Sequence, residues 1–319
     1  MQLQKPLRYE PRVEDGPKSQ FTFRDVIVAA RPQQWTKNSV CLAALIFAGR
    51  LGNLDSVFLA ILASISFCLA SSAIYLFNDI RDREQDRVHP LKRDRPIASG
   101  RLGTEPALIA SFLMASASIA LSLAMGSRFR CVLAIFLTLN LLYSLVLKRL
   151  VIIDVMSIAV GFTLRVQAGI EAILAPQSAW ILLCMFFMAL FLGFGKRRGE
   201  ITNLKGDRSL HQRPVLQAYS VAYLDVLLGL SATTALVCYS LYAVTVQTNE
   251  TFLLTIIPVA FGVARYLMLV IVHAGGEGPD EILARDVPLN VAVVVWALLC
   301  IAVPYFRLSI LPTTHAVLT

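Results

Sequence analysis

Long apolar runs, separated by short polar segments, follow one another along almost the whole chain. Most of these runs reach or approach the roughly 17–25 residues that a helix needs to cross the hydrocarbon of a bilayer. The first run is the weakest, and the residues before it, Phe21 to Ala30, are expected to form an interfacial helix that breaks near Pro32. We predict nine membrane spans, at about residues 34–51, 57–77, 104–125, 129–147, 153–174, 179–195, 217–246, 251–273 and 288–306.

The composition agrees with this pattern. Of the 319 residues, 56% are hydrophobic, whereas soluble domains contain about 45–50%, and the mean hydropathy is +0.66. We therefore predict an all-α fold, a multi-pass membrane bundle of about nine helices that forms one domain over residues 21–319. Residues 1–20 are polar and lack the apolar core of a signal peptide, so we expect a disordered cytoplasmic tail there.

The distribution of lysine and arginine predicts the orientation of the bundle. Of the 29 basic residues, 23 lie in the N-terminal region or in the loops that follow the even-numbered spans. Cytoplasmic loops carry the excess of basic residues in membrane proteins. We therefore expect a protein of the cell inner membrane with its N-terminus in the cytoplasm and, after nine spans, its C-terminus outside.

An acidic segment begins where the second apolar run meets the water. Asn78, Asp82 and Asp86 are spaced i, i+4 and i+8, which on a helix places them on one face. Asp79 lies close enough to join them from the side. Aspartates four residues apart repel each other unless a cation lies between them, and carboxylate oxygens are ligands that suit Mg²⁺. The segment predicts a magnesium site on Asn78, Asp82 and Asp86, with Asp79 as a fourth catalytic candidate. A solvated helix end is the alternative interpretation.

A basic loop follows the acidic segment directly. Lys92, Arg93 and Arg95 lie between Pro90 and Pro96, and the two prolines mark this stretch as a loop. Positive charge at this place is also what a cytoplasmic loop would carry for topological reasons alone. Beside three carboxylates, however, it predicts a clamp for a diphosphate, with arginine as a forked donor and lysine as a point charge. Together the two segments indicate catalysis on a membrane lipid.

A set of sequence motifs extends over about residues 24–306. The NxxxDxxxD spacing from Asn78, followed by HPLKRDRPIASG, resembles the element shared by the UbiA superfamily of intramembrane prenyltransferases. Within that superfamily the chain resembles the decaprenyl-phosphate phosphoribosyltransferases. The motifs that carry this narrower resemblance are RPQQWTKN at 31–38, YS with LKR and Asp154 between 143 and 154, GFTLR at 161–165, KRRGE at 196–200 and the late acidic loop at 275–286.

The resemblance implies a UbiA-like fold and a Mg²⁺-dependent glycosyltransferase, specifically a phosphoribosyltransferase. Its implied substrates are 5-phosphoribosyl 1-diphosphate and a polyprenyl phosphate of the decaprenyl type. The implied products are diphosphate and polyprenylphosphoryl-5-phosphoribose, a precursor of lipid-linked arabinose donors. The acceptor phosphate is already anionic, so no strong general base is needed. We expect no nucleic-acid partner, and assembly into homo-oligomers stays open.

Basic side chains elsewhere are candidates for holding the phosphate groups of such substrates. The sugar 5-phosphate needs a contact that Lys148, Arg149, Lys196 or Arg197 would supply. The full set of substrate-binding candidates is Lys37, Lys92, Arg93, Arg95, Tyr143, Lys148, Arg149, Asp154, Arg165, Lys196 and Arg197.

One of these candidates, Arg165, lies inside a predicted span and shares a helix face with Asp154. An arginine at the centre of a membrane helix costs roughly 2.5–3.5 kcal/mol on insertion scales, so it is expected to face the bundle and meet an anion. That anion is either a substrate phosphate or a neighbouring acid such as Glu171 or Asp225.

Two other functions stay open. The first is a UbiA-type enzyme that moves a prenyl group from a prenyl diphosphate to an aromatic acceptor. Such enzymes carry a second aspartate motif after the sixth span, where this chain has a basic loop, 196–213, with only Glu200 and Asp207 acidic. The second is a membrane transporter whose path includes Arg165, Asp225 and Arg265, although paired interrupted helices are not evident in the sequence.

Overall fold

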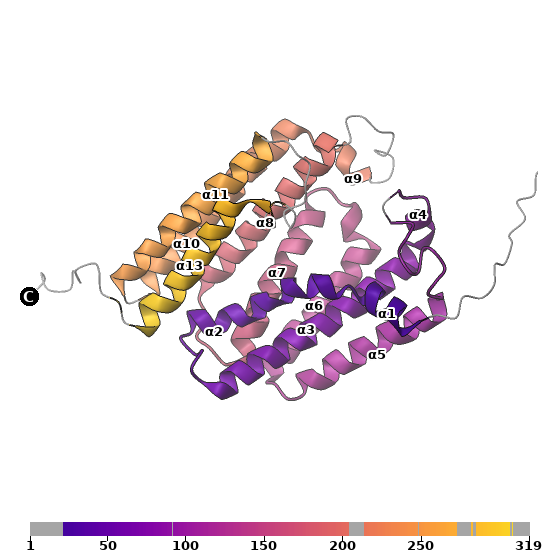
Figure 1. Ribbon diagram of the computed structural model, residues 1–319, viewed down its shortest axis with the longest axis horizontal. Helices are drawn as coiled ribbons and strands as arrows, with labels where there is room; N and C mark the ends of the chain where they lie inside the picture. The colour runs from indigo at the N-terminus through magenta and orange to yellow at the C-terminus, as the bar shows by residue number, and fades with distance from the viewer. Residues whose placement is uncertain are drawn as a thin grey trace, which may run out of the picture.

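The computed structural model describes residues 22–90, 92–203, 214–247, 249–272, 282, 285–306 and 308. The predicted tail at 1–20, the loop at 204–213 with Asp207, and most of the late acidic loop lie outside these residues. Every regular element in the described residues is a helix (Figure 1), so the predicted all-α fold is confirmed.

Eight helices within the described residues are long and apolar enough to cross a membrane. The chain is therefore a multi-pass membrane protein, and the apolar runs predicted these eight spans to within a few residues at most of their ends. The helices are α3 (Leu54–Arg81), α5 (Thr104–Ser122), α6 (Ser127–Leu145), α7 (Ile153–Ala172), α8 (Ala179–Asn203), α10 (Val221–Thr245), α11 (Ile256–Ile271), which the 3₁₀-helix η5 (Glu250–Thr255) precedes, and α13 (Val287–Tyr305).

The first predicted span is helical, but it is not one continuous α-helix. After the short helix α1 (Phe23–Ala30), a 3₁₀-helix, η1 (Pro32–Leu42), leads into the short α-helix α2 (Ala43–Phe47). With rises of about 2.0 Å per 3₁₀ residue and 1.5 Å per α residue, η1 and α2 together are about 30 Å long. That length matches the hydrocarbon thickness of a bilayer, so this segment is long enough to be the ninth crossing that the sequence predicts.

Contacts with α3 give the direction of this crossing. The Trp35 indole N–H donates to the Ser72 hydroxyl at 3.0 Å. Further along, the Ser64 hydroxyl donates to the Asn38 carbonyl at 3.1 Å. The partners on α3 move toward its N-terminus as η1 proceeds, so η1 and α3 are antiparallel neighbours.

Polar contacts between helix termini show that the crossings alternate in direction. At the end of α3, Arg81 donates to the Ser144 carbonyl at the end of α6 at 2.5 Å. At the end of α8, Arg197 pairs with Asp154 at the start of α7 at 2.9 Å. We call this side of the bundle the polar end. It contains the C-termini of α3, α6 and α8, the N-termini of α7 and α10, and the short helices α4 (Arg83–Arg87) and α9 (Pro214–Gln217), as Figure 1 shows.

The bundle has two halves that meet where α7 packs on α8. In one half, α3, α6, α7 and the η1 segment enclose a core that includes Phe67 and Phe136, whose ring centroids lie 4.7 Å apart. In the other half, α8, α10 and α11 enclose Phe191 and Leu224. Large apolar side chains such as Phe112 remain exposed on the outside of the bundle, as expected of a surface that faces lipid.

Helix α8 corrects one prediction. The sequence predicts a loop from Lys196 onward, but α8 continues through Asn203. The extension is stable because the two arginines that follow Lys196 are buried in ion pairs. Arg198 contacts Asp225 of α10 at 2.5 Å, which compensates the cost of burying its charge.

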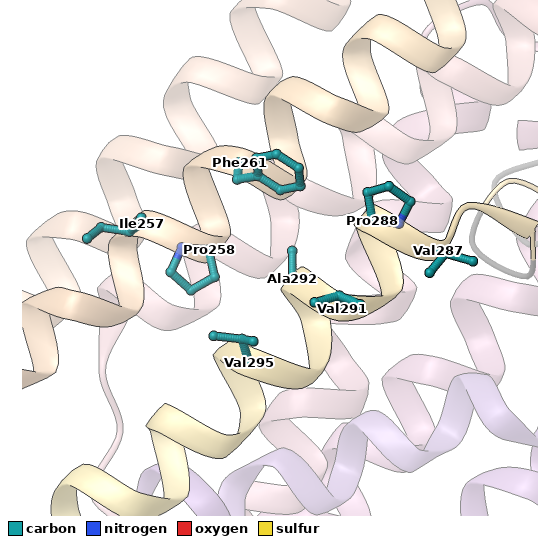
Figure 2. A pocket seen from close by; sticks show the side chains of 8 residues that line it. All are labelled: Ile257, Pro258, Phe261, Val287, Pro288, Val291, Ala292 and Val295. Carbon is teal, nitrogen blue, oxygen red and sulfur yellow. The ribbon is translucent and has the colours of Figure 1, made fainter.

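A groove of about 530 Å³ lies between α11 and α13 (Figure 2). Its lining is apolar and includes Phe261, Val291 and Val295, which project toward the groove from the two helices. It contains none of the predicted site residues. Its apolar lining is typical of a surface that faces lipid.

Candidate active site

Two of the acidic-segment residues, Asn78 and Asp82, converge on one cation at the polar end. The Lys148 ammonium lies 2.8 and 2.7 Å from the two carboxylate oxygens of Asp82. It also donates to the Asn78 side-chain oxygen at 3.2 Å. An ammonium has three donors, so these three oxygens satisfy it. The side chains of Asp82 and Lys148 are each 22% exposed, so this position is open to small ions.

The other two acidic residues, Asp79 and Asp86, converge on a different cation. Arg95 of the basic loop contacts Asp86 at 2.7 Å and Asp79 at 3.2 Å. Arg31, at the start of the first crossing, adds a second contact to Asp79 at 2.5 Å, and Lys92 lies 3.8 Å from Asp86. Both carboxylates are buried, so their charges are compensated by fixed basic side chains rather than by water.

The backbone explains this division only in part. The helical hydrogen bonds continue through the segment, from Asp82 N–H to the Asn78 carbonyl and from Asp86 N–H to the Asp82 carbonyl. However, α3 ends at Arg81 and α4 begins at Arg83, because the ψ angle of Asp82 is 6°. The sequence predicts that Asn78, Asp82 and Asp86 stack on one face around one ion. In the structure, Asn78 and Asp82 contact Lys148, whereas Asp86 contacts Arg95. They form two separate cation positions.

The cation position at Asp82 depends on a precisely anchored neighbour, the 3₁₀ turn η2 (Leu147–Arg149), which carries Lys148. On one side, Arg81 caps the end of α6 by donating to the carbonyls of Ser144 and Leu145 at 2.5 and 3.0 Å. A cation at a helix C-terminus satisfies free carbonyls and opposes the helix dipole. Arg81 thereby fixes the end of α6 against the end of α3, where Asp82 lies.

On the other side of η2, the chain makes a strained turn at Ile152. Its φ is 69° and its ψ is −46°, and the Ile153 N–H bonds the Val151 carbonyl at 2.8 Å. This is a γ-turn with a positive φ, which is rare and costly for a β-branched residue. The Tyr219 hydroxyl accepts the Ile152 N–H at 2.6 Å. Strained backbone of this kind persists where the surroundings hold it and clusters at functional sites.

Tyr219 also connects this turn to a buried ion pair. Its hydroxyl donates to Asp154 at 3.1 Å, and burial raises the pKa of Tyr219 to about 12. The hydroxyl is therefore a permanent donor at physiological pH. Asp154 accepts from Arg197 at 2.9 Å, and Arg197 also contacts Glu200 at 2.6 Å. Asp154 and Arg197, both predicted to bind substrate, are thus buried partners of each other.

Arg165 lies deeper in the bundle and meets no carboxylate among the described residues. Its guanidinium donates to the Asn38 side chain at 2.7 Å and to the Gly161 carbonyl at 2.9 Å. It also lies over the Phe136 ring at 4.7 Å and the Phe162 ring at 5.1 Å. The predicted acidic partners are wrong, because Glu171 accepts from Gln167 and Asp225 pairs with Arg198. Arg265, the third charged residue of the alternative transport path, pairs with Asp286 at 2.8 Å.

The remaining substrate-binding candidates differ in how close they come to the two cation positions. Arg93, Arg149 and Lys196 are exposed at the polar end. Tyr143 lies in the last turn of α6, beside Ser144. Lys37 lies in η1, roughly 12 Å along the first crossing from Arg31. The structure therefore gathers every basic candidate except Lys37 and Arg165 at one end of the bundle.

Sequence reasoning missed three residues that shape this site: Arg31, Arg81 and Tyr219. Arg31 belongs to the RPQQWTKN motif and directly precedes the proline that begins η1. Its charge at that position could have indicated a site residue. Arg81 sits between Asp79 and Asp82 and was counted only toward the topology. Nothing near Tyr219 in the sequence links it to Ile152, which lies 67 residues away.

The side chains at the Asp82 position fit a divalent metal. Among the described residues, no three His, Cys, Asp or Glu side chains converge as a metal cluster. Magnesium, however, usually takes one or two protein carboxylates and completes its shell with water and substrate phosphates. Here an amide oxygen and a carboxylate already surround a cation, the Lys148 ammonium. The donor set is the one that Mg²⁺ prefers.

Comparison with known proteins places the chain among membrane-embedded transferases. Residues 39–277 match the UbiA prenyltransferase family, and the chain belongs to that family. The decaprenyl-phosphate phosphoribosyltransferase of Mycolicibacterium smegmatis is 35% identical over 286 residues, which cover 85% of this chain and 89% of that protein. The protein of the same name from Corynebacterium glutamicum is 34% identical over 293 residues, or 88% of this chain and 86% of that protein.

A solved structure confirms the fold. A UbiA homologue from Archaeoglobus fulgidus bound to GPP and Mg²⁺ superimposes with a TM-score of 0.70. The alignment covers 88% of this chain and 99% of that protein, at 18% sequence identity. The predicted UbiA-like fold is therefore confirmed.

Proposed function

We propose that this protein transfers 5-phosphoribose from 5-phosphoribosyl 1-diphosphate to a polyprenyl phosphate of the decaprenyl type. The product is polyprenylphosphoryl-5-phosphoribose, from which lipid-linked arabinose donors are made. The observation that supports this most directly is the similarity to two decaprenyl-phosphate phosphoribosyltransferases over nearly the full length of each. The site agrees with it, because a highly phosphorylated donor suits an end of the bundle with so many basic side chains.

In the proposed reaction an oxygen of the acceptor phosphate bonds to C1 of the ribose while the bond from C1 to the diphosphate breaks. Charge develops on the leaving diphosphate, so fixed cations near it stabilise the transition state. Arg95 is suited to this role because Asp79 and Asp86 hold its guanidinium in place. Lys92 and Arg93 on the same loop add charge. The acceptor phosphate brings its own nucleophilic oxygen, so no side chain has to remove a proton.

The donor 5-phosphate needs a separate contact. Lys148, Arg149 and Lys196 are the candidates, since they lie at the polar end on η2 and α8. Arg197 is less suited than the sequence indicated, because Asp154 and Glu200 already hold it. Its proposed part is to fix Asp154, which anchors the start of α7 beside η2.

A magnesium ion is part of this proposal. Asn78 and Asp82 would hold it, whereas Asp86, which the sequence also predicts as a ligand, is paired with Arg95. When bound, the ion would neutralise charge on the diphosphate as it leaves. We also propose that the polar end faces the cytoplasm, because the basic residues that predict a cytoplasmic location gather there. The soluble donor then meets the lipid acceptor at the membrane surface.

The experiment that tests this function uses the purified chain in lipid vesicles with Mg²⁺, decaprenyl phosphate and donor radiolabelled in the ribose. The expected result is radiolabel in the lipid fraction that depends on the acceptor and on Mg²⁺. The proposal would be overturned if no labelled lipid formed while a prenyl diphosphate and an aromatic acid gave a prenylated product. A transporter would instead move labelled donor into the vesicles without forming a labelled lipid.

A further inference from the structure

The cation position at Asp82 is already filled by a side chain of the protein. The Lys148 ammonium makes all three of its hydrogen bonds there, two to Asp82 and one to Asn78. The proposed metal would need the same oxygens. An ammonium and a divalent ion cannot share them, because like charges at such a separation repel strongly. One of the two has to leave before the other binds.

The two cation positions differ in how readily their occupants can move. Asp79 and Asp86 are 3% and 5% exposed and are held by a planar guanidinium that contacts both. The Asp82 position is 22% exposed on both partners, and its cation sits at the end of a flexible four-carbon stem. Arg95 itself is 28% exposed, but both of its acids are buried and share it, so the Asp82 position is the more readily exchanged of the two.

The backbone that carries Lys148 is anchored on both sides, whereas its ammonium is held by Asp82 and Asn78. Arg81 fixes the chain before η2, and Tyr219 fixes the γ-turn at Ile152 after it. An ammonium that left Asp82 would therefore stay within one side-chain length of the site. There it could pair with a phosphate of the donor. The negative charge of that phosphate would replace the charge of Asp82.

We propose that Lys148 is a placeholder for the metal. It neutralises Asp82 and Asn78 in the empty enzyme and moves to a substrate phosphate when the metal and the polyphosphate bind together. This inference rests on the proposed function, because it assumes a metal at Asp82. It implies that metal and polyphosphate bind cooperatively, since the polyphosphate draws away the cation that competes with the metal, and such coupling is reciprocal.

Binding of Mn²⁺, measured by electron paramagnetic resonance on the full chain in nanodiscs, tests this proposal without turnover. Manganese suits the same carboxylate and amide oxygens as magnesium. In wild-type protein, inorganic diphosphate should tighten Mn²⁺ binding markedly. In Lys148→Met, Mn²⁺ alone should bind at least about tenfold more tightly than in wild type, because a competing charge is gone. The added gain from diphosphate should be correspondingly smaller.

Two matched variants separate this effect from a general change of surface charge. Lys148→Arg keeps a cation at the position and should bind Mn²⁺ as wild type does. Arg149→Met removes an exposed charge from the neighbouring residue and should change Mn²⁺ affinity by less than about threefold, because exposed charges are screened. If Lys148→Met does not fold, as judged by gel filtration, Lys148→Gln makes the same test with a neutral polar side chain.

The outcomes are distinguishable. If Lys148→Met gains no affinity, or if Arg149→Met gains as much, the placeholder role is overturned while the proposed metal site stands. Asp82→Asn decides the latter, since it should abolish Mn²⁺ binding in wild-type and Lys148→Met backgrounds alike. If Asp82→Asn leaves Mn²⁺ binding unchanged, both the metal site and the placeholder role are overturned.

Discussion

At the scale of single residues, Asp82 differs from the other acids of its segment in its surroundings. Its side chain is 22% exposed and pairs with Lys148, whereas Asp79 and Asp86 are buried beneath Arg95. The same residue type therefore has two roles: Asp82 is suited to bind an incoming cation, and the buried pair is suited to hold a resident one.

We predict that Asp82→Asn lowers phosphoribosyl transfer by about 100-fold or more, the usual cost of removing a group that stabilises developing charge. The folded protein should be recovered in normal amount, because the change leaves a hydrogen-bonding amide at a part-exposed position. Radiolabel transfer to decaprenyl phosphate, together with gel filtration, measures both. Asp94→Asn, an exposed acid on the adjoining loop, is the control and should retain activity. Full activity of Asp82→Asn would remove this residue from the reaction.

Tyr219 leads to a prediction about stability. Removing its hydroxyl in Tyr219→Phe leaves the Ile152 N–H and one Asp154 oxygen without this partner, which should cost about 1–3 kcal/mol of unfolding free energy. Denaturant unfolding followed by tryptophan fluorescence measures it. Tyr223→Phe is the control, because Tyr223 is exposed and stacks on the Tyr219 ring, and its loss should cost less than about 0.5 kcal/mol.

The raised pKa of Tyr219 gives this effect a pH dependence. The folded pKa is about 12, above the ordinary value of about 10 for a tyrosine. A group whose pKa is raised on folding stabilises fully below its unfolded pKa, and this contribution is lost as pH rises through the folded pKa. The difference between wild type and Tyr219→Phe should therefore be constant from pH 6 to about 9 and shrink above about 10. A difference that changed between pH 6 and 9 would contradict this account.

At the scale of elements, the first crossing depends on a close approach to α7. A Cβ added at Gly169 would overlap the backbone carbonyl of Cys41 in η1. We predict that Gly169→Ala pushes η1 from α7 and lowers the unfolding free energy by about 1–3 kcal/mol, as overpacking does. Gly229→Ala in α10 is the matched control, because a Cβ there meets no atom within 4 Å. It should be neutral or stabilise by up to about 1 kcal/mol, the helix preference for alanine.

The elements also show what the sequence could and could not reveal. Apolar length identifies α3, α5 and α7, because a helix that crosses the hydrocarbon needs about 17–25 predominantly apolar residues. The 3₁₀ form of η1 could not be predicted, since its composition also suits an α-helix and its shape depends on packing against α3. The predicted end of α8 lies too early in the chain, because its charged residues were expected to be exposed to solvent. In the structure, Arg197 and Arg198 are buried in ion pairs with acids of other helices.

Contacts between residues far apart in the sequence also limit how much of the site can be predicted. The acidic and basic residues were identified from spacing and charge within one segment, because Asn78 to Arg95 is nearly local. Which cation each carboxylate meets was not available from the sequence, since Lys148 is 66 residues from Asp82 and Arg31 is 48 residues from Asp79. Glu200 was a signal that was not used: its i, i+3 position indicates that Arg197 has an internal partner.

At the scale of the whole molecule, the alternating crossings place the ion pairs of Asp79, Asp82, Asp86 and Asp154 at one end. We predict that this end is cytoplasmic and that nine crossings carry the C-terminus to the other side. An alkaline phosphatase fused at the C-terminus should be active, because it folds only outside the cytoplasm, and a fluorescent protein fused there should be dark. A phosphatase inserted after Asp94 should be inactive. The reverse pattern would invert the orientation and remove the soluble donor's access to the site.

The central claim is that Asn78 and Asp82 bind a metal that in turn binds the diphosphate of the donor. An experimental structure determined with Mg²⁺ and inorganic diphosphate tests it most directly. We expect a cation in contact with Asp82 and a diphosphate oxygen, with the Lys148 ammonium displaced toward the phosphates. A diphosphate bound elsewhere, with Lys148 still on Asp82 and no cation between them, would contradict it.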